Sequence, residues 1–229
     1  MSANDRQLDW EGCRNVRDLG GLRAADGRET RRGAMVRSDA VDRLTSAGWE
    51  ALQAYGIRTI VDLRNPDERG ADVAPRPQGL TTVSLPLDGI EHRDFWDLWS
   101  GGPQFATPLY YGPFLERFPD RTARVVAAIA HAAPGGVLFH CVRGRDRAGL
   151  VAMLLLALVG VAPEDIAADY GLGTGRPDED AEVEEFLARQ GTTAGEIVLS
   201  TLASVDVEAH LRTGGLDTAG LMAARARLL

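Results

Sequence analysis

The sequence contains no lysine, and all 25 of its basic residues are arginine. Without lysine the chain cannot form the GxxxxGK[ST] loop that many nucleotide-binding proteins share. Only two cysteines occur among 229 residues, which argues against a disulfide framework. The four histidines include no pair at ligand spacing on a helix, so we expect neither a metal site nor another cofactor.

A positive net charge and long apolar segments are absent as well. The formal net charge of −8 argues against nonspecific binding to nucleic acid. The longest apolar run covers residues 150–159, far short of the roughly 20 residues that span a membrane, so we expect no integral membrane segment. No signal-peptide pattern is recognisable near the first residue. We therefore expect a cytoplasmic protein, with secretion that needs no signal peptide as the alternative.

The most informative stretch runs from His140 to Gly149, with the sequence HCVRGRDRAG. It follows a short apolar run at residues 136–139 and leads into the long one at residues 150–159. This order places Cys141 at the end of a strand and Arg147 at the start of a helix. A loop of this kind directs backbone N–H groups and the positive end of the helix dipole at one point, where a phosphate would bind.

The residues around Cys141 suit nucleophilic chemistry on phosphate. A helix N-terminus and neighbouring arginines favour the thiolate, which is the reactive form of cysteine. Arg147 can present a planar fork to two phosphate oxygens. His140 is expected to support the loop backbone rather than to act as a base. The predicted phosphate-binding residues are Val142, Arg143, Gly144, Arg145, Asp146 and Arg147. The alternative, a buried structural cysteine, would not explain three arginines beside one thiol.

The stretch from His140 to Gly149 resembles the HCxxGKDRTG loop of bacterial cysteine-dependent tyrosine phosphatases, a family that also has lipid-phosphatase-like members. Two further stretches agree with that family, and the resemblance covers nearly the whole chain. The first stretch comprises Asn15, Val16, Arg17, Asp18, Leu19, Gly20 and Gly21, and the second Asp62, Leu63, Arg64, Asn65, Pro66, Asp67 and Glu68. The resemblance implies hydrolysis of phosphotyrosine, with dual specificity as an option, through a cysteinyl-phosphate intermediate. It also implies inhibition by phosphate-like oxyanions.

Two positions depart from the family pattern. Arg145 stands where the family has Lys, which keeps the charge. Ala148 stands where the family has Thr or Ser, whose hydroxyl is expected to stabilise the leaving thiolate when the phosphoenzyme is hydrolysed. Losing one charge-assisted hydrogen bond costs roughly 1.5–3 kcal/mol, so the sequence predicts a working but slow enzyme.

A general acid must protonate the leaving oxygen, and two carboxyl groups are candidates. Asp146 lies within the loop and matches an Asp of the family, but its arginine neighbours are expected to lower its pKa. Its alternative role is to orient an arginine or a backbone N–H. Asp88, after the strand-like residues 80–87, is the alternative acid, because other tyrosine phosphatases carry theirs on a separate loop.

The remaining motif residues leave several interpretations open. Arg17 and Asp18 could form a structural pair, or Arg17 could border the phosphate pocket. Arg64 could contact Asp62 or the substrate. Asn65 followed by Pro66 is typical of a helix start. Cys13 is expected to be a packing residue, although a protective bond to Cys141 under oxidation is an alternative.

Apolar periodicity and turn residues predict an α/β fold with a mostly parallel central sheet of about four or five strands flanked by helices. We expect strands at residues 34–36, 57–63, 83–87 and 136–139. The expected helices cover residues 46–55, 107–118, 121–132 and 150–159. The active loop, residues 140–147, then lies at the carboxyl end of a strand, where such sheets bind ligands.

We expect a single domain over residues 1–229, with an α/β core at residues 1–160 and a helical extension at 161–229. Helices are expected at residues 163 onward, 180–189, 193–202, 207–211 and 218–229. Gly171, Gly173 and Gly175 suggest a hinge. The acidic residues that follow are either a solvated helix face or part of a lid over the cationic loop: Asp178, Glu179, Asp180, Glu182, Glu184 and Glu185.

Three functions therefore stay open for this chain. The first is a phosphatase for phosphotyrosine proteins. The second is a phosphoinositide phosphatase, in which Arg143 and Arg145 would hold a second phosphate. The third is a phosphate-binding protein whose turnover decayed with the loss of a hydroxyl at Ala148. The substrate rim is expected at residues 88–105, where aromatic residues begin to cluster.

Overall fold

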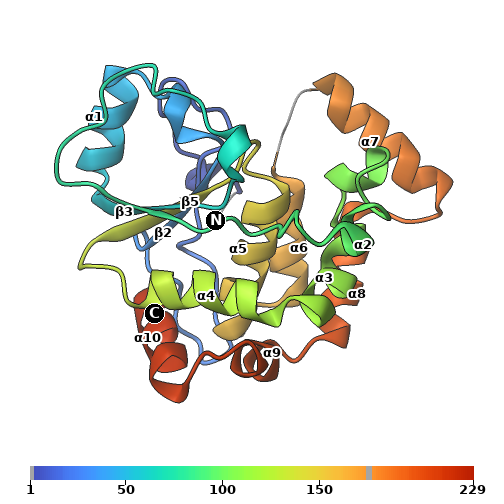
Figure 1. The fold of residues 1–229 in the computed structure, drawn as a ribbon. Helices are drawn as coiled ribbons and strands as arrows, with labels where there is room; N and C mark the ends of the chain where they lie inside the picture. The colour runs from blue at the N-terminus through green and yellow to red at the C-terminus, as the bar shows by residue number, and fades with distance from the viewer. Residues whose placement is uncertain (1–2, 174–176) are drawn as a thin grey trace.

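The computed structural model describes residues 3–173 and 177–229 and has an α/β architecture (Figure 1). Its five-stranded sheet has the order β1–β2–β5–β3–β4, in which β1 runs antiparallel to β2 and all other neighbours are parallel. The strands are β1 (Arg17–Asp18), β2 (Met35–Ser38), β3 (Ile57–Asp62), β4 (Thr81–Ser84) and β5 (Gly136–His140). The predicted fold class and strand number are confirmed.

The central strand β5 is buried on both faces, as its apolar sequence predicts. Val137 and Phe139 face the larger hydrophobic core, whereas Leu138 faces the smaller one. The smaller core also contains Trp49 and Leu52 of helix α1. Two packed layers of helix and loop therefore hold the strand that leads into the predicted loop.

Helix α1 covers one face of the sheet, and α4 and α5 lie on the other (Figure 1). Short 3-10 helices connect several elements: η1 (Ala3–Arg6), η2 (Val41–Arg43), η3 (Pro66–Glu68), η4 (Pro103–Ala106) and η5 (Pro108–Tyr110). The α-helices before residue 160 are α1 (Ser46–Ala54), α2 (Arg93–Trp96), α3 (Tyr111–Arg117), α4 (Pro119–Ala130) and α5 (Asp146–Leu158).

The chain after residue 160 is helical where it is described, as predicted. Val198, Leu211 and Leu221 belong to the same large hydrophobic core as α5, so this part packs on the sheet layer as one body. Gly175, one of the three expected hinge glycines, lies outside the described residues. The helices are α6 (Pro163–Gly171), α7 (Pro177–Arg189), α8 (Ala194–Ser204), α9 (Val207–Thr213) and α10 (Thr218–Leu228).

Most predicted elements differ from the structure by a few residues in their bounds. The strand expected at residues 83–87 is β4, which begins and ends earlier, at Thr81 and Ser84, although Leu85 N and Leu87 N still donate to the carbonyls of Asp62 and Leu63. The strand expected at 34–36 begins and ends later, as β2. The helix expected at 107–118 is split into η5 and α3, which places Pro113 in the first turn of α3, where its missing N–H costs nothing. The helix start expected at Asn65 is a single 3-10 turn, η3.

No described helix is both long enough and apolar enough to cross a membrane. Nor do three or more His, Cys, Asp or Glu side chains gather as metal ligands anywhere in residues 3–173 or 177–229.

Candidate active site

The predicted loop lies at the carboxyl edge of the sheet, at its centre. His140, the last residue of β5, is in register with Ser38 of β2 and with Asp62 of β3. Cys141 follows directly and is only 2% exposed, and α5 begins at Asp146. The thiol therefore lies between a strand end and a helix N-terminus, as the sequence predicted.

Gly144 fixes the tight curvature of this loop. Its φ of +67° lies in the left-handed region that favours glycine. A Cβ atom at this position would lie 2.6 Å from the backbone nitrogen of Asp39, which is closer than such atoms approach. The loop consequently packs backbone against backbone on the residues that follow β2.

Every backbone carbonyl from Cys141 to Asp146 accepts a hydrogen bond from outside the loop's concave side. Because a trans peptide unit places each carbonyl opposite the next N–H, the N–H groups of residues 142–147 face the interior of the loop. The donors are His140 Nδ1 (to Cys141, 3.3 Å), Ala40 N (to Val142, 3.2 Å), Asn15 Nδ2 (to Arg143, 2.8 Å), Arg37 Nη2 (to Gly144, 2.8 Å, and Arg145, 3.1 Å) and Tyr111 Oη (to Asp146, 2.5 Å). These donors come from five separate places in the sequence, and together they hold a cradle of N–H groups open for an anion.

Arg37 is itself fixed by a buried carboxylate on α6. Asp169 accepts from Arg37 Nη1 at 2.8 Å and from Arg6 Nη1 at 2.7 Å, and Arg17 Nε lies 3.2 Å from the same carboxylate. Asp169 is 1% exposed, and Arg17 and Arg37 are both fully buried. Three guanidinium groups thus surround one carboxylate behind the loop, which leaves positive charge on the side of the loop away from solvent.

Arg147 lies on the other side of the loop and contacts two carboxylates. Its Nη1 and Nη2 atoms donate to Glu68 Oε2 and Oε1 at 2.5 and 2.6 Å, a bidentate pair. Its Nη1 also lies 2.9 Å from Asp88 Oδ2. Carboxylate oxygens of Glu68 and Asp88 therefore hold the guanidinium of Arg147 in one orientation.

Asp88 is almost fully buried in this cluster, at 4% exposure. Its Oδ2 accepts from Asn65 Nδ2 at 3.0 Å, and its backbone carbonyl accepts from Trp96 Nε1 at 2.9 Å. Burial raises the pKa of Asp88 to about 6, because loss of solvation and the nearby Glu68 outweigh the charge of Arg147. A carboxyl group whose pKa lies this close to neutrality is suited to general acid catalysis.

Asp146, the other candidate acid, occupies the first position of α5. Its Oδ1 atom is buried and has no hydrogen-bond partner among the described residues. Burial raises the pKa of Asp146 above its ordinary value, although Arg145 and Arg143 act in the opposite direction. The lowered pKa that the sequence predicted is therefore wrong, because the arginine charges do not compensate for desolvation.

The other loop residues also have defined surroundings. Arg145 Nη1 pairs with Asp180 of α7 at 2.5 Å, and its guanidinium lies 5.8 Å from the centre of the Tyr170 ring. Burial lowers the pKa of His140 to about 4, so its ring is neutral and donates to the Cys141 carbonyl from Nδ1. Ala148 is completely buried in α5.

Several motif residues have structural contacts. Arg17 and Asp18 do not pair with each other. Asp18 accepts from the backbone of Gly20 and Gly33, at 2.8 Å each, and from the Tyr55 hydroxyl at 2.5 Å.

Two other open questions concern Arg64 and Cys13. Arg64 pairs with Asp62 at 3.0 Å and with Asp42 at 2.6 Å, so the alternative in which it contacts Asp62 is the one observed. Cys13 Sγ lies 3.6 Å from the Ala40 carbonyl, and burial raises its pKa, so this thiol is a poor nucleophile.

The sequence did not identify Glu68, Arg37 or Asp169 as part of the site. Glu68 appeared only as the last residue of the second family stretch, and its Oε2 also accepts from Asn65 N at 2.8 Å. Asp169 carried a signal: it lies three residues after Ile166 on the buried face of α6, where an acid must have a partner.

Comparisons with known proteins agree with this geometry. The chain is 36% identical over 169 residues to a Cupriavidus necator protein named as a tyrosine-protein phosphatase, covering 71% of this chain and 61% of that one. It is 32% identical to a tyrosine-protein phosphatase of Nostoc commune, covering 65% and 52%. The chain thus spans about three fifths and about half of these two relatives.

A third relative is matched over more of its length. The triple specificity protein phosphatase PtpB of Mycobacterium tuberculosis is 29% identical over 224 residues, covering 84% of this chain and 79% of that protein. Among solved structures, that of TpbA from P. aeruginosa aligns with 78% of this chain and 84% of its own, with a TM-score of 0.44 at 16% identity. The model of the tyrosine phosphatase family matches residues 8–227, and the chain therefore belongs to that family.

Proposed function

We propose that this protein hydrolyses phosphotyrosine in proteins through a cysteinyl-phosphate intermediate on Cys141. The observation that carries the proposal is the outward anchoring of all six carbonyls from Cys141 to Asp146, which leaves the loop N–H groups directed at one point. Preorganised donors of this kind stabilise the charge of a phosphoryl group in transfer. The thiol is at the base of the same cradle.

In the first step, Cys141 Sγ attacks phosphorus in line with the leaving group. The S–P bond forms, the ester P–O bond breaks, and the leaving phenolate oxygen takes a proton from a carboxyl group. Arg147 binds two of the phosphoryl oxygens in place of Glu68. Asp88 is the acid that the geometry favours, because it is buried beside Arg147 with a pKa raised to about 6. Asp146 is the alternative acid.

In the second step, the carboxylate that gave up its proton in the first step takes a proton from water, the water oxygen forms a bond to phosphorus, and the S–P bond breaks as the Cys141 thiolate leaves. Ala148 is buried in the first turn of α5 and supplies no hydroxyl to this thiolate. The loop N–H groups and the helix dipole remain to stabilise the departing sulfur. We therefore expect breakdown of the phosphoenzyme to limit turnover.

Helix α7 is proposed to act as a lid on this site. Asp180 reaches Arg145 at 2.5 Å and so places a carboxylate at the rim of the cationic loop. A substrate phosphate would compete with that carboxylate for Arg145. Asp180 then balances the charge of Arg145 until substrate binds.

The test compares two cysteine variants on a phosphotyrosine peptide in the presence of EDTA. Cys141→Ser should lose hydrolysis, whereas Cys13→Ser, the matched control, should keep it. Brief incubation with a phosphate-labelled aryl substrate should trap label on the wild-type protein and not on Cys141→Ser. Hydrolysis that persists in Cys141→Ser would refute the proposal. Faster hydrolysis of inositol phospholipids than of the peptide would reassign the substrate class to lipid.

A further inference from the structure

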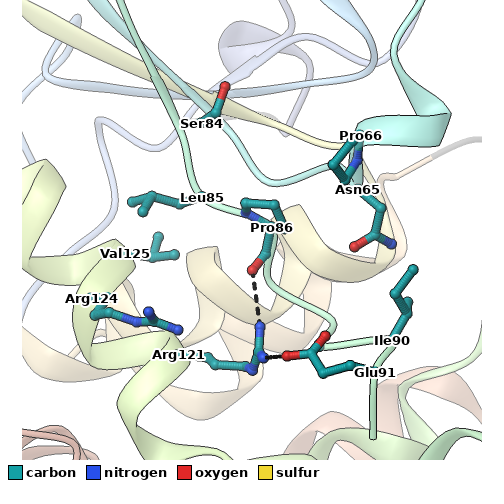
Figure 2. A pocket seen from close by; sticks show the side chains of 11 residues that line it. Asn65, Pro66, Ser84, Leu85, Pro86, Ile90, Glu91, Arg121, Arg124 and Val125 are labelled. Atoms are coloured by element: carbon teal, nitrogen blue, oxygen red, sulfur yellow. Dashed lines mark hydrogen bonds and ion pairs between the residues drawn. The ribbon is translucent and has the colours of Figure 1, made fainter. Parts of the chain in front are cut away.

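A second pocket lies beside the loop that carries Asp88. Its volume of about 430 Å³ falls within the ordinary range of ligand pockets, about 300–1,000 Å³. One wall is the chain that follows β4, including Leu85 and Pro86, and the opposite wall is α4 (Figure 2). The pocket is therefore formed by elements that also shape the active site.

Asn65 connects this pocket to the catalytic cluster. It lines the pocket, and its Nδ2 donates to Asp88 Oδ2 at 3.0 Å. Asp88 Oδ2 in turn lies 2.9 Å from Arg147 Nη1. Two contacts, Asn65 with Asp88 and Asp88 with Arg147, therefore link the pocket to the loop. A peptide whose phosphotyrosine enters the loop would extend close to the pocket.

Arg121 provides a fixed positive charge in the pocket. Its side chain is only 13% exposed, and its Nη1 donates to the Pro86 carbonyl at 3.4 Å. The guanidinium lies 5.9 Å from the centre of the Phe118 ring and packs on Gly89, where a Cβ would lie 2.5 Å from Arg121 Cζ. These contacts hold the group in one orientation, which lowers the entropic cost of binding an anion.

Arg124 adds a second charge on the same face of α4, three residues further on. In Figure 2 its side chain extends towards that of Arg121. It is 59% exposed and pairs with Asp120 at a distance of 3.5 Å, a weak surface interaction. The third charged residue of the pocket is Glu91, whose side chain is 63% exposed. Its carboxylate pairs with Arg121.

We propose that this pocket is a subsite for an acidic side chain of the substrate, one or a few residues from the phosphotyrosine. The inference rests on the proposed function and adds a substrate preference to it. The carboxylate of Glu91 already pairs with Arg121, and a substrate Asp or Glu would bring the same chemical group. Leu85, Ile90 and Val125 supply an apolar wall for the methylene groups of such a side chain.

The charges of the pocket favour a carboxylate over a second phosphate. Glu91 and Asp120 balance the charges of Arg121 and Arg124, and a substrate carboxylate that displaces the exposed Glu91 from Arg121 brings the same single negative charge. A phosphate dianion would leave an excess of negative charge beside Glu91, and like charges at close range repel. The observations therefore point to an acidic peptide rather than to a multiply phosphorylated lipid headgroup.

The experiment measures the ratio of kcat/KM for two phosphotyrosine peptides that differ only by Glu or Gln at the flanking positions. Arg124→Gln should lower this ratio about two- to fivefold, the size expected when one exposed ion pair is lost. Glu91→Gln should raise it, because Arg121 loses its internal competitor. The matched control is Arg117→Gln, whose side chain on α3 pairs with Asp94 and does not line the pocket, and it should leave the ratio unchanged.

The outcomes separate the subsite from the proposed function. Absence of hydrolysis of both peptides and of p-nitrophenyl phosphate by the wild-type protein would overturn the phosphatase itself. Hydrolysis of both peptides at one rate, or equal ratios in Arg124→Gln and Arg117→Gln, would overturn only the subsite. A change in Arg124→Gln that is confined to inositol phospholipid hydrolysis would overturn the assignment to an acidic peptide.

Discussion

Replacing Asp88 by Asn should stabilise the folded protein at neutral pH while it impairs catalysis. Asp88 is 4% exposed, and burial raises its pKa to about 6 from an ordinary value of 3.8. In the folded protein its ionisation is therefore unfavourable relative to the unfolded chain. Asn keeps the shape and an oxygen that can accept from Asn65 Nδ2, but it has no charge to desolvate.

The magnitude follows from the difference between the two pKa values. About two units correspond to about 3 kcal/mol, because one unit is worth about 1.4 kcal/mol. Since the folded pKa is the higher one, folding binds a proton between pH 4 and pH 6, and wild-type stability falls as pH rises through that window. The variant should gain little below pH 4 and about 1–3 kcal/mol above pH 6, the lower value allowing for the lost contact with Arg147.

The assay is urea unfolding of both proteins between pH 4 and pH 8, read as the difference in free energy of unfolding. The pKa of His140 is lowered to about 4, so this residue makes both proteins less stable as pH falls below 6.5. Because its contribution is the same in both proteins, it cancels when the free energy of unfolding of one is subtracted from that of the other. The descending limb of the wild-type pH–rate profile should vanish in Asp88→Asn and persist in Asp146→Asn. The reasoning would be refuted if Asp88→Asn were no more stable than wild type at pH 7.5. It would also be refuted if the difference in free energy of unfolding between the two proteins did not change with pH.

Three other outcomes follow from the site. Ala148→Ser, or the bulkier Ala148→Thr, should raise turnover about tenfold or more by restoring a hydrogen bond worth roughly 1.5–3 kcal/mol, and stopped-flow release of phosphate from the trapped phosphoenzyme should show the gain. Asp169→Asn should lower the free energy of unfolding by about 3–5 kcal/mol, because it leaves buried guanidinium groups without their counter-charge; a loss below about 1 kcal/mol in urea unfolding would contradict this. Vanadate should raise amide hydrogen exchange in α7 by releasing Asp180 from Arg145, and exchange that vanadate leaves unaltered would count against the lid.

The architecture was predictable because its signals are local. The apolar run before His140, the Thr45 cap of α1 and the alternation of strand and helix patterns each depend on neighbouring residues. The errors occurred at strand and helix ends. The strand β4 ends at Ser84, and Pro113 lies in the first turn of α3, which begins after the separate turn η5.

The loop was predictable for the same reason, but the groups that hold it were not. Arg37 meets Asp169 across 132 positions of sequence, and Asn15 meets the Arg143 carbonyl across 128. No local pattern encodes such contacts. The raised pKa of Asp146 was also out of reach, because desolvation depends on burial, and burial depends on the completed fold.

The carboxylates around the loop explain how binding and proton transfer can be coupled. Glu68 and Asp88 contact Arg147, and Asp180 contacts Arg145, so each meets the loop through a guanidinium group. A tetrahedral dianion can use the same guanidinium of Arg147 and also the loop N–H groups, which gives it an advantage over a side-chain carboxylate. Its two negative charges beside Asp88 raise the pKa of that carboxyl group further, since a nearby like charge favours the protonated form. In the proposed reaction, substrate binding would therefore help Asp88 to keep the proton that the leaving oxygen needs.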